Sequence, residues 1–254
     1  MNVLVCVRRV PSPGARIALT DDGQAVDTRH LGFTISPHEE CAVEEAVQIV
    51  ERHGGASTVL ALGPVEAQDQ LRTAISMGID HGVLLPTDTT DVDPRATAHA
   101  IADAIRTLES EGAAFDLVLF GNESADAGNH QVGIRVAHAL GRPVVSGIKQ
   151  IDLDAGVATM HRSVADGLEV CELPLPAVAA VREGLNLPRY PAMRGRLLAK
   201  KAEIRHLTPT LQPGGLRTVR LRHPAQQVTE TVVLGHGREA AAAVVDLLEE
   251  VGAL

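Results

Sequence analysis

Aromatic residues are the scarcest feature of this sequence of 254 residues, which has no Trp, one Tyr and three Phe. This scarcity disfavours a protein that stacks bases or sugars on its own rings. Positive charge is also in deficit: the net charge is −9, and no basic stripe is present that would release counterions from nucleic acid. We therefore expect no nucleic-acid partner.

Cysteine is also rare. The three cysteines, Cys6, Cys41 and Cys171, are far apart and form no C-x-x-C pair. A disulfide framework or a zinc site is not expected, and Cys6 and Cys41 are expected to be buried, unreactive thiols. No apolar run reaches the length of a membrane span, and no leader is expected before the first strand. These absences favour a soluble, cytoplasmic protein without membrane insertion.

What the sequence does contain is a regular alternation of strand and helix patterns through residue 140. The predicted strands are residues 3–7, 57–62, 82–85 and 117–120, and the predicted helices are residues 37–51, 65–77 and 94–108. Such alternation is typical of a parallel sheet with helices on both faces. We predict the α/β class, with a Rossmann-like sheet of the type that binds adenine nucleotides.

The pattern changes after Gly141. Residues 148–153, 157–164 and 168–173 predict an antiparallel ribbon, residues 177–181 another buried strand, and residues 193–201 a short basic helix. Residues 203–228 have the weak periodicity of an arm that lies on its own domain or on a partner. A final helix is predicted at residues 237–251. The predicted division is a domain of residues 1–201 and a C-terminal arm with a helix at residues 202–254.

A capping box marks the start of the helix at 37–51. Ser36 can cap the helix, Pro37 suits its first position, and Glu39 can complete the box. The acidic pairs at 39–40 and 44–45 are most simply interpreted as solvated faces of this helix. Nothing in them suggests a general acid–base pair.

The segment Leu117–Gly133, LVLFGNESADAGNHQVG, is an apolar run followed by a loop with small residues and then a helical pattern from near Asn129. The N–H groups of a first helical turn and the helix dipole can hold a phosphate at such a place. A plain connection between a strand and a helix is an equally good interpretation of this segment alone.

Ligands of parallel sheets bind at the carboxyl ends of the strands. The stretches to inspect are therefore those that follow a predicted strand or open a helix: Cys6–Pro13, Ser36–Glu39, Leu62–Pro64 and Gly121–Gly133. The fold class predicts that they share one edge of the sheet.

Motifs of bond-making enzymes are missing. No P-loop and no G-x-S-x-G occur, and no histidine or acidic cluster suggests a metal site. Residues 235–240 match G-x-G-x-x-A, but the chain offers no later strand to complete a dinucleotide-binding unit, so a turn and a helix start are favoured. With no catalytic residues to nominate, the sequence favours nucleotide binding or electron transfer.

Several long motifs closely resemble the electron-transfer flavoprotein beta subunit family. The family's signature region is matched at Met160–Val170, Leu175–Val178, Leu185–Tyr190 and Ala199–Lys201. The first part of the chain is matched at Val3–Val10, Ala42–Val47, Leu62–Pro64 and Leu71–Gly78. These motifs occur in the family's order and cover most of residues 1–201, and the final helix is similar to the family's C-terminus.

The resemblance implies an electron carrier that forms a heterodimer with an alpha subunit. That subunit holds most of a redox-active FAD, whereas the beta subunit buries a structural AMP. Electrons would come from acyl-CoA dehydrogenases, as in fatty acid oxidation, or from other dehydrogenases, and would pass to a quinone oxidoreductase.

The resemblance also implies site residues by position. The AMP pocket is expected to involve Cys6, Ser36, Pro37, His38, Glu39, Leu62, Gly63, Ser124, Asp126, Gly128, Asn129, His130, Gln131 and Val132. The phosphate is expected on the backbone N–H groups of His130, Gln131 and Val132. A partner-recognition loop is expected at residues 182–191, with contacts from Leu185, Asn186, Leu187, Pro188, Arg189 and Tyr190. Leu185 is expected to be the apolar anchor that enters the dehydrogenase.

The sequence departs from the family pattern in places. Leu187 stands where a glutamate is usual in the family, which bears on the choice of partner. After the first strand, near position 13, a proline stands where many members have an aromatic residue close to the flavin. Gln131-Val132-Gly133 also occurs in bifurcating relatives, which bind a second FAD in place of AMP. Two alternatives therefore stay open: a bifurcating flavoprotein, and an adenine-nucleotide sensor with no redox role.

Overall fold

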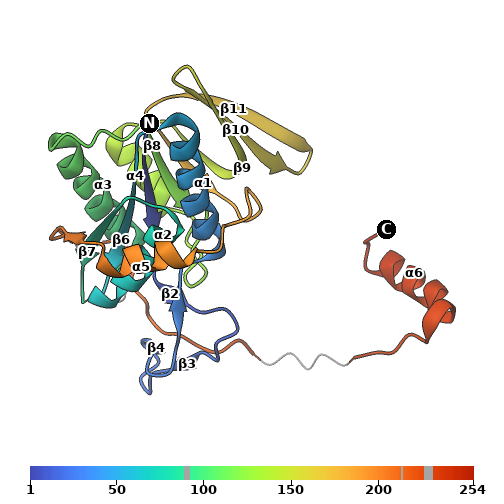
Figure 1. Cartoon of the computed structure of the whole chain (residues 1–254). Coiled ribbons are helices and arrows are strands. Elements are labelled where there is room, and N and C mark those ends of the chain that lie inside the picture. Colours follow the sequence, from blue (N-terminus) through green and yellow to red (C-terminus); the bar gives the residue numbers. More distant parts are fainter. Residues whose placement is uncertain (89–91, 213, 226–230) are drawn as a thin grey trace. The chain divides into compact units, whose positions relative to one another are not determined.

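The structure is a computed structural model that describes residues 1–88, 92–212, 214–225 and 231–254. The chain divides into two compact units, Met1–Arg220 and Leu221–Leu254. In the first unit a large, mostly parallel sheet carries helices on both faces (Figure 1). This architecture confirms the predicted α/β, Rossmann-like class.

The sheet is built around strand β1. Among the described residues, the sheet has nine strands in the order β11-β10-β9-β12-β8-β1-β6-β7-β13. The parallel part comprises β1 (Asn2–Val7), β6 (Ala56–Gly63), β7 (His81–Pro86), β8 (Leu117–Gly121), β12 (Ala177–Val181) and β13 (Ile204–His206). The predicted antiparallel ribbon is confirmed as β9 (Val144–Asp154), β10 (Val157–Val164) and β11 (Gly167–Pro174). β9 joins the parallel part by pairing with β12.

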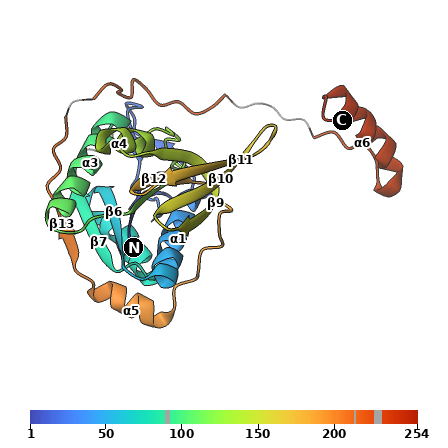
Figure 2. The same ribbon diagram turned by 90° about the horizontal axis from the view of Figure 1, so that it is seen from above.

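Helices cover the two faces of the sheet separately (Figure 2). One core cluster includes residues of α1 (Pro37–His53) and α2 (Gln68–Met77), and the other includes residues of α3 (Pro94–Ser110) and α4 (Val132–Leu140). β1 contributes side chains to both clusters: Val3 and Val5 belong to the first, and Leu4 and Cys6 belong to the second. This alternation follows from the two-residue period of a strand. Burial on both faces explains the continuous apolar run of this strand.

Helix α5 (Met193–Lys201) packs on α2. A Cβ on Gly195 would lie 2.4 Å from the carbonyl oxygen of Ser76, so glycine allows the close approach of the two helices. Arg72 of α2 also donates to the carbonyl of Ala199 at 2.6 Å, near the C-terminus of α5. The remaining short elements of this unit are β2 (Val10–Pro11), β3 (Ala18–Leu19), β4 (Val26–Asp27), β5 (Phe33–Thr34) and the 3-10 turn η1 (Val65–Ala67).

Two predicted elements differ from the structure. The helix after β8 begins at Val132 and not near Asn129, because Gly128 and His130 adopt left-handed backbone conformations that no right-handed helix contains. The helix predicted at 65–77 begins with the 3-10 turn η1. Part of the predicted arm, β13, extends the sheet by pairing with β7, which is the first of the two predicted alternatives, an arm on its own domain.

The second unit holds the final predicted helix as the 3-10 turn η2 (Gly237–Ala240) followed by α6 (Ala241–Glu250). Residues 231–234 form no strand, so the G-x-G-x-x-A match at 235–240 is a turn and a helix start, as favoured. No residue of α6 is buried. Within the residues that the structure describes, no helix is both long and apolar enough to cross a membrane.

Candidate functional site

The end of β1, the start of α1 and the loop after β8 meet at one edge of the sheet. Glu39 Oε2 accepts hydrogen bonds from the backbone N–H groups of Arg8 and Ser36, at 3.0 and 3.3 Å. Arg8 Nε lies 2.7 Å from Asp126 Oδ2. These contacts join three stretches that are far apart in the sequence. The fold therefore places them together, as the alternation of strands and helices predicts.

Glu39 is buried in this edge, with 7% of its surface exposed. Burial raises the pKa of its carboxyl group to about 7, although hydrogen bonds from Arg8 and Ser36 act in the opposite direction. A Cβ on Gly121 would lie 2.7 Å from Glu39 Cγ, so the glycine at the end of β8 makes room for the glutamate. The interpretation of Glu39 as part of a solvated face is wrong, because its carboxylate caps buried N–H groups.

Two polar side chains lie buried at the start of α1. Ser36 forms the predicted capping box with Glu39, and His38 Nδ1 has no hydrogen-bond partner in the described part of the chain. Burial lowers the pKa of His38, so its imidazole is largely neutral near pH 7. An unpaired buried polar group costs about 1–3 kcal/mol. Polar atoms of a bound nucleotide would remove this cost, so His38 fits such a ligand.

Strands β1 and β6 contribute the residues near their carboxyl ends to this edge of the sheet. Cys6 is 5% exposed. Burial, and to a lesser extent the charge of the nearby Glu39, raises the pKa of its thiol group. The prediction of a buried, unreactive cysteine is therefore confirmed. Cys41 is buried as well. Leu62 and Gly63 end β6, the neighbour of β1, and so lie at the same edge.

The loop predicted to hold the nucleotide phosphate, residues 122–131, connects β8 to α4, and we call it the nucleotide loop after that prediction. His130 Nε2 lies 2.6 Å from Glu123 Oε2, and Asn122 Nδ2 donates to His130 Nδ1 at 3.2 Å. Gly128 N donates to the Ser124 carbonyl at 3.1 Å and so closes a turn inside the loop. Residues 125–130 are exposed, and α4 begins at Val132, two residues after them in the sequence. This arrangement leaves helix N–H groups available to an anion.

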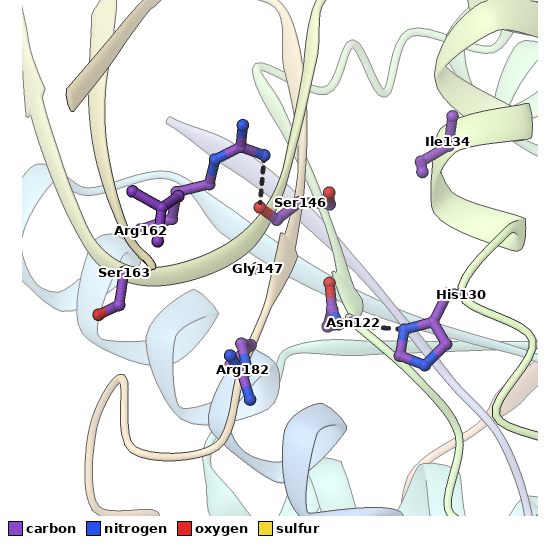
Figure 3. A pocket seen from close by; sticks show the side chains of 9 residues that line it. Asn122, His130, Ile134, Ser146, Gly147, Arg162, Ser163 and Arg182 are labelled. Atoms are coloured by element: carbon purple, nitrogen blue, oxygen red, sulfur yellow. Dashed lines mark hydrogen bonds between the residues drawn. The ribbon is translucent and has the colours of Figure 1, made fainter. Parts of the chain in front are cut away.

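A hollow of about 370 Å³ lies beside the nucleotide loop (Figure 3). We call it the arginine hollow; its lining residues come from β8, β9, β10, β12 and α4 and their adjoining loops: Asn122, His130, Ile134, Ser146, Gly147, Arg162, Ser163, Val164 and Arg182. Except for His130, none of these residues is among the sequence-predicted site residues. Arg162 and Ser163 lie in a motif of the family resemblance, but no local spacing indicated that they would face residues 122 and 130.

The two arginines of the arginine hollow differ in how far their charge is neutralised. Arg162 Nε lies 2.5 Å from Glu169 Oε2, and Arg162 Nη1 donates to the Ser146 carbonyl at 3.5 Å. Arg182 is exposed and forms no ion pair within the described residues. The hollow therefore suits an anionic or polar group that extends past His130.

The loop predicted to contact a partner, residues 182–191, is bonded to α1, and we call it the recognition loop after that prediction. Arg189 forms ion pairs with Glu44 and Glu51 at 2.9 and 2.6 Å, and its backbone N–H donates to Glu44 Oε2 at 3.0 Å. Asn186 Nδ2 donates to the Cys41 carbonyl at 3.0 Å and to Glu45 Oε2 at 3.1 Å. These contacts fix the loop from its middle to its end.

The glutamates that hold the recognition loop are buried. Glu44 and Glu45 are 3% and 5% exposed, so their interpretation as a solvated pair is also wrong. Burial raises the pKa of Glu45, whereas for Glu44 hydrogen bonds from Arg189 and Gln48 outweigh burial and lower the pKa. Glu44 is therefore a charged group inside the protein, neutralised by Arg189.

Side chains of the recognition loop divide into inward and outward sets. Leu185 packs against the core, and Pro188 is half-buried. Leu187 and Tyr190 are 90% and 84% exposed, and the guanidinium of Arg196 lies 4.7 Å from the centre of the Tyr190 ring. In the described residues no group of three or more His, Cys, Asp or Glu side chains is arranged to hold a metal ion.

Comparisons with known proteins agree with this architecture. The family described as "Electron transfer flavoprotein domain" matches residues 25–211. The "Electron transfer flavoprotein subunit beta" of Syntrophomonas wolfei is 38% identical over 205 residues, which cover 80% of this chain and 78% of the relative. The proteins of the same description from Mycobacterium tuberculosis and Bacillus subtilis are 35% and 32% identical, each over 82% of this chain and 79% of the relative. This chain belongs to the electron-transfer flavoprotein beta subunit family.

Proposed function

We propose that the chain is the beta subunit of a heterodimeric electron carrier in the cytoplasm. An alpha subunit would hold most of a FAD, and the heterodimer would take electrons from acyl-CoA dehydrogenases or other dehydrogenases and deliver them to a quinone oxidoreductase. The FAD supplies the redox chemistry when bound. Residues of this chain bind, position and shield, since none of them forms or breaks bonds.

We propose in addition that the edge formed by Cys6, residues 36–39, residues 62–63 and the nucleotide loop holds AMP. The observation that carries this proposal is the buried His38 Nδ1, which has no hydrogen-bond partner in the described residues and belongs to a side chain beside the loop that leads into α4. The N–H groups of His130, Gln131 and Val132 would receive the phosphate, and Ser124, Asp126, Gly128 and Asn129 would border it. A neutral His38 and a hydroxyl group suit the sugar and base of a nucleotide.

The second unit supports the heterodimer. The spacing of Val244, Val245 and Leu248 places them on one face of α6. An apolar helix face of this kind has to pack on another surface. We propose that residues 202–254 pack on the alpha subunit in part through α6, and that residues 182–191 contact the dehydrogenase.

A specific observation favours a second candidate, a bifurcating flavoprotein. The arginine hollow shares His130 with the proposed phosphate site and offers Arg182, which forms no ion pair in the described residues. A ligand that continues beyond its first phosphate, such as a second FAD, would find room and positive charge there. AMP alone would leave the hollow to solvent.

The test is a nucleotide inventory of the purified heterodimer. Denaturation should release one FAD and one AMP for each heterodimer if the first proposal holds. Two FAD and no AMP would contradict the AMP proposal and support the bifurcating candidate. A colourless protein that binds AMP and forms no complex with any co-expressed alpha subunit would contradict both and support the nucleotide sensor.

A further inference from the structure

The nucleotide loop is tied to the end of β1 by an ion pair. Arg8 Nε lies 2.7 Å from Asp126 Oδ2, and the two residues are 118 positions apart in the sequence. Arg8 directly follows β1, whereas Asp126 lies in the middle of the loop that follows the neighbouring strand β8. The pair therefore crosses the carboxyl edge of the sheet at the proposed nucleotide site.

Both partners of the pair are held in place by other contacts. The backbone N–H of Arg8 donates to the buried Glu39 at 3.0 Å, which fixes the start of the arginine side chain. Asp126 Oδ1 accepts from the N–H of Ala127 at 2.7 Å, which orients the carboxylate toward Arg8. Their side chains are 37% and 23% exposed, so solvent screens the pair only in part. Little side-chain freedom is lost when the pair forms.

Other contacts of the loop are mostly internal. Glu123 and Asn122 both contact His130, and Gly128 bonds back to Ser124, so these contacts stay within the loop itself. Among the described residues, two other cationic side chains reach the loop from outside. Arg135 of α4 donates to the side-chain oxygen of Gln131, the last residue of the loop, at 3.1 and 3.0 Å, and His38 Nε2, on a largely neutral imidazole, lies 3.7 Å from Glu123. Arg8 is thus the charged group that joins the middle of the loop to the body of the domain.

We propose that Arg8 and Asp126 form a latch that closes the nucleotide loop over the bound nucleotide and slows its release. This inference rests on the proposed function, which places AMP, or the AMP part of a second FAD, under this loop. Asp126 also borders the proposed phosphate site, whereas Arg8 is not one of its residues, so the ion pair between them is what has to open before the nucleotide leaves. It accounts for a nucleotide that is held through repeated electron transfer.

The experiment measures nucleotide exchange in the purified heterodimer. Wild-type protein and the variants Arg8→Gln, Asp126→Asn and Arg8→Gln/Asp126→Asn are mixed with excess radiolabelled AMP, and the bound label is followed in time. The incorporation rate reports how fast the resident nucleotide leaves. Asp27→Asn is the matched control, because Asp27 pairs with Arg29 in the β3–β4 hairpin and the chemical change is the same.

Each single variant is expected to exchange about fivefold faster than wild type, the size of effect that one partly exposed ion pair gives. The double variant should be no faster than the single variants, the Asp27→Asn control should match wild type, and the swapped pair Arg8→Asp/Asp126→Arg should restore slow exchange. High salt should accelerate exchange in wild type and leave the double variant unchanged.

Two results would overturn the latch. If Asp126→Asn accelerates exchange and Arg8→Gln does not, Asp126 acts by touching the nucleotide directly. If both variants exchange at the wild-type rate, the pair has no role in release. A wild-type heterodimer that contains neither AMP nor a second FAD would instead contradict the proposed function, and that result is visible before any variant is made.

Discussion

Arg189 and Glu44 are 145 positions apart, yet two guanidinium nitrogens of Arg189 donate to the two carboxylate oxygens of Glu44, Nε at 2.9 Å and Nη2 at 3.0 Å. The same guanidinium also donates to both oxygens of Glu51 at 2.6 and 2.9 Å. A planar fork of donors makes such paired contacts, whereas an ammonium group does not. The recognition loop is therefore attached to α1 by one arginine that forms ion pairs with two glutamates of that helix.

Replacing this arginine should weaken the domain. Arg189→Lys keeps the charge but leaves oxygens of the buried Glu44 unpaired, so the free energy of unfolding is expected to fall by about 2 kcal/mol. Urea denaturation measures the change. Arg29→Lys is the matched control, because Arg29 also forms paired contacts with one carboxylate, but on an exposed hairpin. It should leave stability unchanged, and an equal loss in both variants would contradict a special role for Arg189.

The two leucines of the recognition loop should separate folding from docking. Leu185→Ala is expected to destabilise the domain by about 2 kcal/mol, because Leu185 packs against the core. Leu187→Glu should leave stability unchanged at an exposed position, yet raise the KM for the dehydrogenase in flavin-reduction assays. Val170→Glu, at a residue of β11 that is 54% exposed and lies outside both this loop and residues 202–254, is the control. If Leu187→Glu leaves KM unaffected, the side chain does not contact the dehydrogenase.

The buried Glu39 predicts a pH dependence. Its pKa is about 7 in the folded chain against an ordinary value of 4.5, so the folded state binds the proton more tightly. The stability that this carboxyl group contributes is present below pH 4.5 and is lost as the pH rises through 7. The loss amounts to roughly 3 kcal/mol.

Glu39→Gln is the variant that tests this dependence, because a glutamine oxygen can still accept from the N–H groups of Arg8 and Ser36. The difference in free energy of unfolding between variant and wild type should grow in favour of the variant from pH 5 to pH 8. Glu45 and the other acidic groups titrate in both proteins and cancel in this difference. A constant difference across that range would show that Glu39 is ionised throughout.

Gly121 should not tolerate a side chain. The added methyl group of Gly121→Ala would lie 2.7 Å from Glu39 Cγ and 3.1 Å from its backbone nitrogen. Crowding of this kind costs about 2 kcal/mol, and it should also weaken AMP binding, because α1 begins there. Gly63→Ala, at the same edge, is the control for stability: its Cβ would meet Ala67 at 3.4 Å, an ordinary contact. Calorimetry on both variants measures the difference.

Local signals in the sequence are sufficient for most of the fold. β1 and β8 are continuous apolar runs because helices cover both faces, and Ser36-Pro37 marks the start of α1. The start of α4 was placed too early because the left-handed conformation of His130 has no sequence signature: histidine usually adopts the right-handed region.

The parts of the site that the sequence does not reveal are non-local. Glu44 and Glu45 resemble a solvated acidic pair, and their burial depends on Arg189 and Asn186, which arrive from the far end of the chain. The arginine hollow likewise joins side chains from several strands, so no spacing along the chain indicates it. Burial of charge can be predicted only when the partner is known.

The attachment of the recognition loop to α1 has an evolutionary consequence. Asn186 and Arg189 contact buried glutamates, so a change at either position disturbs the fold as well as the loop. Leu187 and Tyr190 contribute almost nothing to the core and are free to vary. Under the proposed function, single substitutions at these two exposed positions would change the electron donor, while selection for folding preserves the scaffold beneath them.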